Sequence, residues 1–118
     1  MTVAKYIQIM SGEDEFCLPY DWINVFKEYD SSFECQRVPG ARPDILGLNW
    51  YQGELYPCFK GKNHNMREEK KEIVVLICTD NGTKAALLID GAGMEGEADG
   101  ETMVQEIKRI EDHWQFEL

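Results

Sequence analysis

The side chains that most often carry chemistry are few and widely separated in this chain. There are two histidines, His64 and His113. The four cysteines stand singly, at Cys17, Cys35, Cys58 and Cys78. Zinc sites use such residues in close pairs, and a Cys–His dyad would need distant residues to converge. The spacing therefore predicts no metal site, no cofactor and no catalytic residue, and it predicts that both imidazoles are exposed. Three of the four cysteines lie in strand-like apolar contexts, where we expect them to pack as small apolar side chains.

A glycine-rich acidic segment covers residues 90–101. Its GAGMEG stretch, residues 91–96, matches the G-x-G-x-x-G pattern of dinucleotide sites. Such a site needs a helix N-terminus facing the pyrophosphate, whereas Glu95, Glu97 and Asp99 would repel that anion. As a calcium loop the segment fails because Glu95 stands where glycine is required. We expect a solvated flexible loop, and weak cation binding by its carboxylates remains an alternative.

Composition and charge limit the classes of function. The 118 residues are 43% hydrophobic and 29% charged, which is typical of one folded domain spanning residues 1–118. A net charge of −10 disfavours nucleic acid, although residues 60–72 carry +2. The longest apolar run, Ile73–Cys78, cannot span a bilayer, and the N-terminus has no apolar stretch of signal length. We expect a cytoplasmic protein without direct membrane insertion, with reduced cysteines.

Alternating apolar residues predict that strands predominate. Residues 4–10 and 15–19 form a first expected hairpin. The spacing then changes to that of one helical face and predicts a short helix within residues 19–29, carried by Trp22, Val25, Phe26 and Tyr29.

Two further hairpins are expected in the middle of the chain. Residues 38–59 read as turn, strand, Gln-Gly turn and strand. Residues 72–90 contain two apolar runs joined by Asn81-Gly82, a pair that readily adopts the positive φ angles of a type I′ turn.

The C-terminal segment fits two secondary structures. Trp114, Phe116 and Leu118 alternate as in a strand. Upstream of them, Met103, Ile107 and Ile110 fit one face of a helix, and Thr102-x-x-Gln105 imitates a capping box. The residue pattern alone leaves both possibilities open.

The order of these features over nearly the whole chain resembles the CheW-like domain of bacterial chemotaxis adaptors. Seven elements match the pattern of that family in order and with compatible spacing. They are Val38, Pro39, Pro43, Gly47, Gly53, Pro57 and Asp90.

The resemblance implies an all-β fold with one or two short helices, built as two small SH3-like five-stranded β-barrels that share a core. It implies strands rather than a helix at the C-terminus, with residues 105–110 pairing with residues 113–118. It also implies a protein without catalytic activity, whose partners are the regulatory domain of a chemotaxis histidine kinase and the cytoplasmic tip of a chemoreceptor.

Two departures from the family pattern affect the expected contact surface. The family has arginine where this chain has Gln52, and commonly has a glutamate, which pairs with that arginine, where this chain has Val25. Losing both members of an ion pair together can leave stability nearly unchanged. We therefore expect a binding surface that is altered rather than lost. Strand alternation predicts that one of Trp50 and Tyr51 points inward and the other outward. The candidate protein-binding residues are Ile23, Val25, Gly47, Trp50 and Gln52.

The sequence thus favours an adaptor that binds through an apolar groove between the barrels, with selectivity from charge. Two other hypotheses remain. One is a divergent CheW-like protein of a non-motility pathway. The other is a small-ligand or metal-binding protein that uses the acidic segment 90–101 together with the scattered cysteines and histidines.

Overall fold

The structure is a computed structural model that describes residues 3–29, 33, 35–37, 39–40, 42–62, 64 and 72–116. Its elements, in chain order, are β1 (Val3–Ser11), β2 (Asp14–Pro19), the 3₁₀ turn η1 (Tyr20–Trp22), β3 (Ile23–Tyr29), β4 (Ile45–Tyr51), β5 (Glu54–Phe59), β6 (Glu72–Cys78), β7 (Lys84–Ile89), β8 (Gly91–Asp99) and α1 (Gly100–Trp114). Val38, residues 65–71 of the basic segment and Leu118 of the expected last strand lie outside the described residues. Among the described helices, none has the length and apolar character needed to cross a bilayer.

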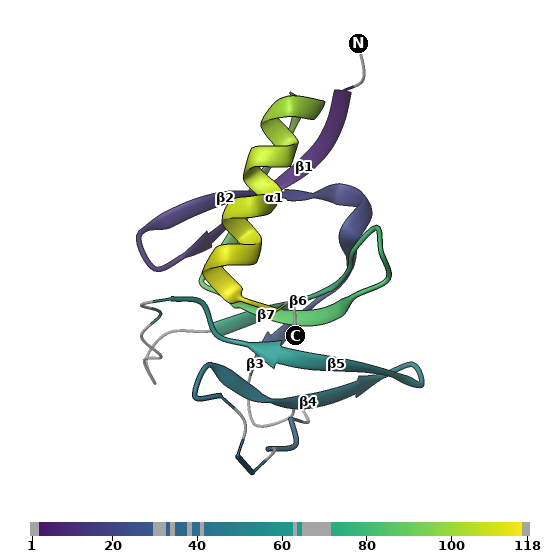
Figure 1. The fold of residues 1–118 in the computed structure, drawn as a ribbon, viewed down its shortest axis with the longest axis vertical. Coiled ribbons are helices and arrows are strands. Elements are labelled where there is room, and N and C mark those ends of the chain that lie inside the picture. Colours follow the sequence, from purple (N-terminus) through teal and green to yellow (C-terminus); the bar gives the residue numbers. More distant parts are fainter. Residues whose placement is uncertain are drawn as a thin grey trace.

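The strands form two sheets, which confirms the predicted mostly-β class (Figure 1). The larger sheet has the order β3-β6-β7-β5-β4, and the smaller has the order β2-β1-β8. The resemblance implied five strands in each unit, whereas the smaller sheet has three in the described part of the chain and α1 lies beside it.

The three predicted hairpins are present, as β1–β2, β4–β5 and β6–β7. The two-residue turn between paired Tyr51 and Glu54 has positive φ at both Gln52 (51°) and Gly53 (78°), as a type I′ turn requires. In the fully described loop 79–83, only Gly82 has positive φ, so the predicted type I′ geometry at Asn81 is wrong. That loop is longer than two residues, and its backbone is closed by a hydrogen bond from Thr79 N to Thr83 O (2.9 Å).

The predicted helix within residues 19–29 is wrong beyond the single turn of η1, because β3 begins at Ile23. Both faces of β3 contact apolar side chains, with Phe26 packed on one side and Val25 and Tyr29 on the other. A strand with two apolar faces can reproduce helical spacing, and β-branched and aromatic residues favour the strand.

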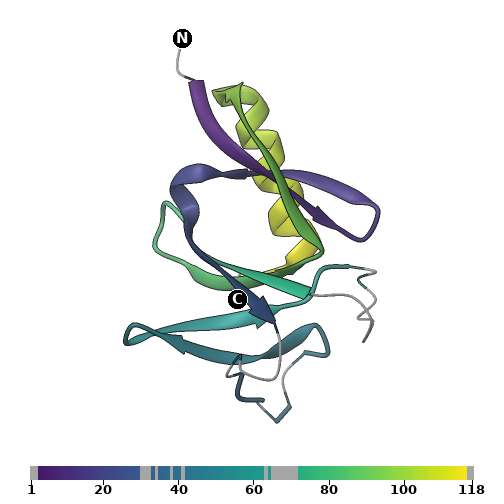
Figure 2. The ribbon, with the colours of Figure 1, turned by 180° about the vertical axis from the view of Figure 1, so that it is seen from behind.

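The predicted acidic loop is also wrong, because residues 91–99 form β8, which pairs antiparallel with β1. Its glycines leave room for neighbours on β1. A Cβ at Gly96 would lie 2.4 Å from the Tyr6 ring, so glycine there allows the close approach of the two strands. Seen from behind, β1 and β8 run together across the molecule with α1 beyond them (Figure 2).

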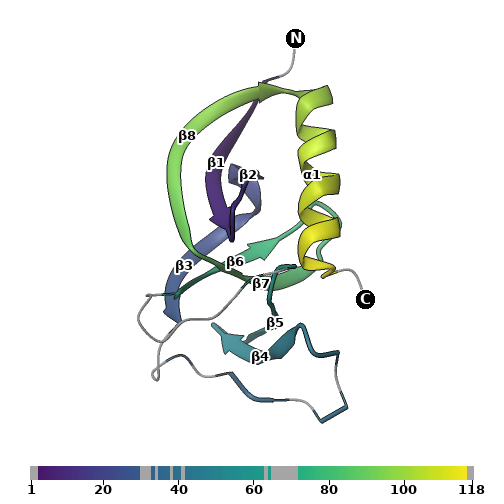
Figure 3. The same cartoon turned by 90° about the vertical axis from the view of Figure 1, so that its left-hand side faces the viewer.

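The C-terminal segment is helical, so the hairpin implied by the resemblance is wrong and the helical alternative from the residue pattern is correct. Met103 and Ile110 are buried and Ile107 is packed against the core, as the helical face predicted. The N-cap is Asp99, whose carboxylate accepts a hydrogen bond from Thr102 N at 2.7 Å. Figure 3 shows α1 and β8 on opposite sides of β1 and β2.

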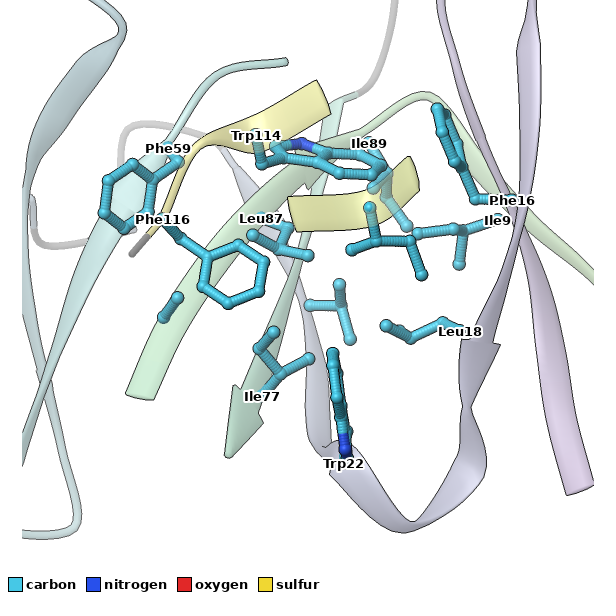
Figure 4. Packing of buried hydrophobic residues seen from close by; sticks show 13 residues of the cluster. Ile9, Phe16, Leu18, Trp22, Phe59, Ile77, Leu87, Ile89, Trp114 and Phe116 are labelled. Atoms are coloured by element: carbon cyan, nitrogen blue, oxygen red, sulfur yellow. The ribbon is translucent and has the colours of Figure 1, made fainter. Parts of the chain in front are cut away.

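An apolar core fills the space between the two sheets and α1 (Figure 4). Its buried members are Ile9, Phe16, Leu18, Trp22, Phe59, Val75, Ile77, Ala85, Leu87, Ile89, Ile110, Trp114 and Phe116. A second cluster covers the other face of the larger sheet, with Phe33, Tyr56, Cys58, Val74, Leu76, Ala86 and Leu88 buried in it. The central strands β6 and β7 are therefore apolar on both faces, which accounts for their continuous apolar runs.

Candidate functional site

The tip of the β4–β5 hairpin presents the largest exposed aromatic side chain of the described residues. Trp50 is 62% exposed, while the next residue, Tyr51, is half-buried against the second apolar cluster. The prediction that one of the two points inward and the other outward is confirmed. A tryptophan left in solvent on a folded surface is informative, because this side chain is usually well covered.

Contacts on the inner side fix the hairpin tip. The Tyr51 ring packs edge-on against the Tyr56 ring with centroids 6.4 Å apart, and Lys27 Nζ lies 4.7 Å from the Tyr51 centroid. Asn24 Nδ2 donates to the Tyr56 hydroxyl at 2.8 Å. Asn24 and Lys27 belong to the edge strand β3, so these contacts join β3 to Tyr56 of β5 and to Tyr51 of the other edge strand, β4.

Gln52 occupies the first position of the type I′ turn, beside the exposed Trp50. Its side chain is exposed, and its Nε2 lies 3.4 Å from the Tyr51 hydroxyl. Positive φ is uncommon for a residue with a Cβ, so the turn holds this side chain in a restricted direction. Trp50 and Gln52 together form the hairpin-tip surface.

The other three predicted binding residues do not join this surface. Ile23 packs against the core between the sheets, and Val25 packs against the second cluster. Gly47 is buried, with a φ of +149°, and a Cβ there would lie 2.6 Å from Gln36 O. The close backbone contact explains why glycine is required at this position of β4.

A buried polar cluster, which no spacing of residues in the sequence indicates, lies at the margin of the core. Ser11, His64, Glu72 and His113 are all buried, so the prediction of two exposed histidines is wrong. Ser11 Oγ lies 2.9 Å from His113 Nε2 and 3.4 Å from His64 Nδ1. His64 Nε2 lies 2.9 Å from Glu72 Oε2. Positions as far apart as 11 and 113 contain no spacing signal, so only the fold could bring them together.

The cysteines are all free thiols. Cys58 is fully buried in the second cluster, where desolvation raises the pKa of its thiol far above the ordinary value, and burial also raises the pKa of Cys35. Raised pKa values keep both sulfurs protonated and poorly nucleophilic. The predicted role as small apolar side chains is confirmed for Cys58, while Cys17, Cys35 and Cys78 are only half-buried.

Comparison with known proteins rests on structure. No protein-family model and no curated protein sequence matches the chain. The fold is similar to that of the scaffolding protein TtCheW from Thermoanaerobacter tengcongensis, with a TM-score of 0.64 and 15% identity over 85% of this chain and 68% of that one. The chain has a CheW-like fold.

The CheW-like fold accounts for the elements that the sequence pattern predicted best. The hairpins β4–β5 and β6–β7 carry Gly53, Pro57 and the strand that ends just before Asp90, all of which belong to the resemblance. At 15% identity the likeness concerns the fold alone. The hairpin-tip surface is therefore described from the residues of this chain and not from the similar structure.

Proposed function

We propose that this chain is a non-catalytic cytoplasmic adaptor of chemotaxis-type signal transduction, which couples chemoreceptors to the regulatory domain of a histidine kinase. The observation that carries the proposal is the likeness of 85% of the chain to a protein described as a scaffold. A second support is the hairpin-tip surface, where an exposed tryptophan stands on a fixed turn.

The chemistry of the surface fits a protein-binding role. The binding energy of a protein interface concentrates in a few anchor residues, and tryptophan is enriched among them. The backbone of Trp50 is paired with Leu55 of β5, so docking this side chain would not require ordering of the backbone. The net charge of −10 would steer encounters toward basic partner surfaces and away from acidic ones.

A titration tests the proposal directly. The chain is titrated with a kinase regulatory domain and, separately, with a receptor-tip fragment from the same organism, and binding is measured by calorimetry. We expect binding to at least one of them. If neither partner binds at concentrations up to about 100 µM, the adaptor role is refuted, because a dissociation constant above that value is weaker than that of nearly any productive signalling contact.

Substitution of the anchor locates the contact. Trp50→Ala is expected to weaken binding by about tenfold or more, because a central aromatic anchor carries much of the binding energy. Val104→Ala serves as the control, because Val104 is 54% exposed and belongs to α1. Figure 1 shows α1 in the part of the molecule away from β4 and β5. Equal losses of affinity in the two variants would show that the hairpin-tip surface is not part of the interface.

Service in a non-motility pathway is the second candidate, favoured by the exposed Gln52 where the family has arginine. Expression of the chain in a strain that lacks its chemotaxis adaptor separates the two. Restored swarming supports chemotaxis, whereas kinase binding without restored swarming supports another pathway.

A further inference from the structure

The buried polar cluster contains a group of metal-binding side chains at the junction of four segments. His64 lies in the connection between β5 and β6, Glu72 begins β6, and Asp90 separates β7 from β8. Ser11 ends β1 beside them. The side chains of His64, Glu72 and Asp90 are 1%, 5% and 11% exposed, so the group is almost completely shielded from water.

One carboxylate of this group has an unsatisfied oxygen. Asp90 Oδ2 accepts a hydrogen bond from Gly12 N at 2.5 Å. Glu72 Oε1, in contrast, is buried and has no hydrogen-bond partner among the described residues. Burying a polar atom without a partner is costly. An unpaired carboxylate oxygen of this kind is the atom that a bound cation would satisfy.

The ligand atoms lie close enough to share one ion. His64 Nε2 is 2.9 Å from Glu72 Oε2 and 3.8 Å from Asp90 Oδ1, and one ligand atom from each residue lies within 4.8 Å of the others. Around a tetrahedral ion with bonds of about 2.1 Å, ligand atoms are roughly 3.4 Å apart. The observed separations bracket that value, so small side-chain rotations would complete the site.

The surroundings of His64 are those of a metal ligand. If Nε2 binds the ion, Nδ1 must carry the proton, and it faces Ser11 Oγ at 3.4 Å. Ser11 can then donate its own proton to His113 Nε2 at 2.9 Å, which satisfies all three groups. Hydrogen bonding of the second ring nitrogen is the usual way in which proteins orient a metal-binding histidine.

Gly61 brings the His64 segment into place. A Cβ at Gly61 would lie 2.3 Å from His113 Nε2 and 2.9 Å from Ser11 Oγ, so any larger residue would push this segment away. Lys62 N also donates to His113 O at 3.1 Å. The connection that supplies His64 is therefore held against the ends of β1 and α1.

From these observations we propose that His64, Glu72 and Asp90 bind a divalent transition-metal ion, with Zn²⁺ as the first candidate. One imidazole and two carboxylates suit Zn²⁺ and its first-row neighbours better than they suit Ca²⁺, which prefers more oxygen ligands. Because the group is shielded, the ion has a structural role, joining the β5–β6 connection to β6 and to the β7–β8 junction. This site is independent of the adaptor role proposed above.

Metal binding is tested on the full chain after chelator treatment. Calorimetric titration with Zn²⁺ is expected to give one site per chain and a raised melting temperature. Glu72→Gln and His64→Gln are each expected to weaken Zn²⁺ binding by at least about tenfold. Asp112→Asn is the matched control and should retain binding within a few-fold, because Asp112 is exposed and lies outside the ligand group and its hydrogen-bond partners.

Two further measurements keep the test decisive if a variant folds poorly. Without metal, Glu72→Gln should melt no lower than the wild type, because it removes a buried charge of an incomplete site. Wild type loaded with Co²⁺ should show visible d–d absorption without thiolate-to-cobalt charge transfer. Failure of the wild type to bind Zn²⁺ or Co²⁺, binding that is unchanged in Glu72→Gln and His64→Gln, or a thiolate signature would each overturn the proposal.

Discussion

Each sheet has an edge strand whose backbone groups bond to a neighbouring segment, but the two segments differ in kind. At β4 the partner is backbone, because Gln36 N donates to Leu48 O (2.9 Å) and Leu48 N donates to Gln36 O (2.8 Å). At β2 the partners are side chains of α1. Glu106 Oε2 accepts from Cys17 N (3.1 Å), and Arg109 Nη2 donates to Glu15 O (3.2 Å).

The difference shows that a helix can replace a strand at a sheet edge. Unpaired edge groups invite association with other chains, and both arrangements satisfy some of them. Backbone pairing demands a particular main-chain path, which at β4 requires Gly47. Side-chain cover demands only that the helix stays docked, and the docking of α1 depends on Trp114.

Removing the side chain that anchors α1 should have the largest effect on the stability of the fold. Trp114 is fully buried, and its Nε1 donates to Leu88 O at 3.2 Å. Trp114→Ala is expected to lower the free energy of unfolding by about 3–5 kcal/mol, through the cavity and the lost hydrogen bond. Urea denaturation measures this. Trp50→Ala, at an exposed position, should change stability by less than about 0.5 kcal/mol. Similar losses in both variants would mean that α1 is not held as the structure indicates.

The backbone-covered edge should be sensitive to a single methyl group. Gly47→Ala places a Cβ against Gln36 O and Cys35 Sγ at a positive φ, so we expect a loss of about 1–3 kcal/mol in urea denaturation. Gly100→Ala is the matched control, because a Cβ there meets nothing within 4 Å. It should be neutral or stabilise the helix by up to about 1 kcal/mol. A neutral Gly47→Ala would show that the edge contact with residue 36 can move.

The side-chain-covered edge should respond more mildly and locally. Glu106→Ala removes the acceptor for Cys17 N, and we expect a cost of about 1 kcal/mol. Hydrogen exchange followed by NMR should show faster exchange of the Cys17 amide, with β6 and β7 unchanged. Lys108→Ala, an exposed substitution on the same helix, should leave that amide unaffected. Unchanged exchange in Glu106→Ala would contradict the proposed cover.

The helix N-terminus should give the smallest effect, and it should depend on pH. The backbone N–H of Thr102 lowers the pKa of the Asp99 carboxyl in the folded state below its ordinary value of 3.8. A lowered folded-state pKa stabilises the fold at pH above the unfolded value, and this contribution is lost as pH falls through the folded value. The melting temperature of Asp99→Ala should therefore lie below that of wild type near neutral pH and approach it in acid. A difference that is independent of pH would exclude the carboxylate as its origin.

The hairpins of both sheets were predictable because their signals are local. The β6–β7 hairpin joins two apolar runs through a glycine turn, and the β4–β5 hairpin joins its strands through Gln52-Gly53. The strands β3 and β8 were not predicted, because their strand character depends on neighbours distant in the sequence. The glycines of β8 are typical of a loop. Only the pairing with β1 shows that Gly96 makes room for the Tyr6 ring. In α1 the residue spacing was informative, and the family expectation was the misleading part.

Of the candidate site, strand alternation alone predicted that Trp50 and Tyr51 point in opposite directions, and the structure shows that Trp50 is the exposed one. Ile23 and Val25 would share one face of a regular strand, but a bulge between them places them on different apolar clusters. The residue types in this segment do not predict that bulge. The grouping of His64 with Glu72 and Asp90 required the tertiary fold, because each residue comes from a different connection or strand end.

The pairing of β1 with β8 has a consequence for how the chain reaches its native state. Val3 pairs with Asp99, and the helix contacts on β2 come from still later residues. Contacts this distant in sequence close large loops and form slowly. During synthesis the β1–β2 hairpin must therefore leave the ribosome and keep open edges until residues 91–109 have emerged. This interval is when the nascent protein would depend most on chaperones.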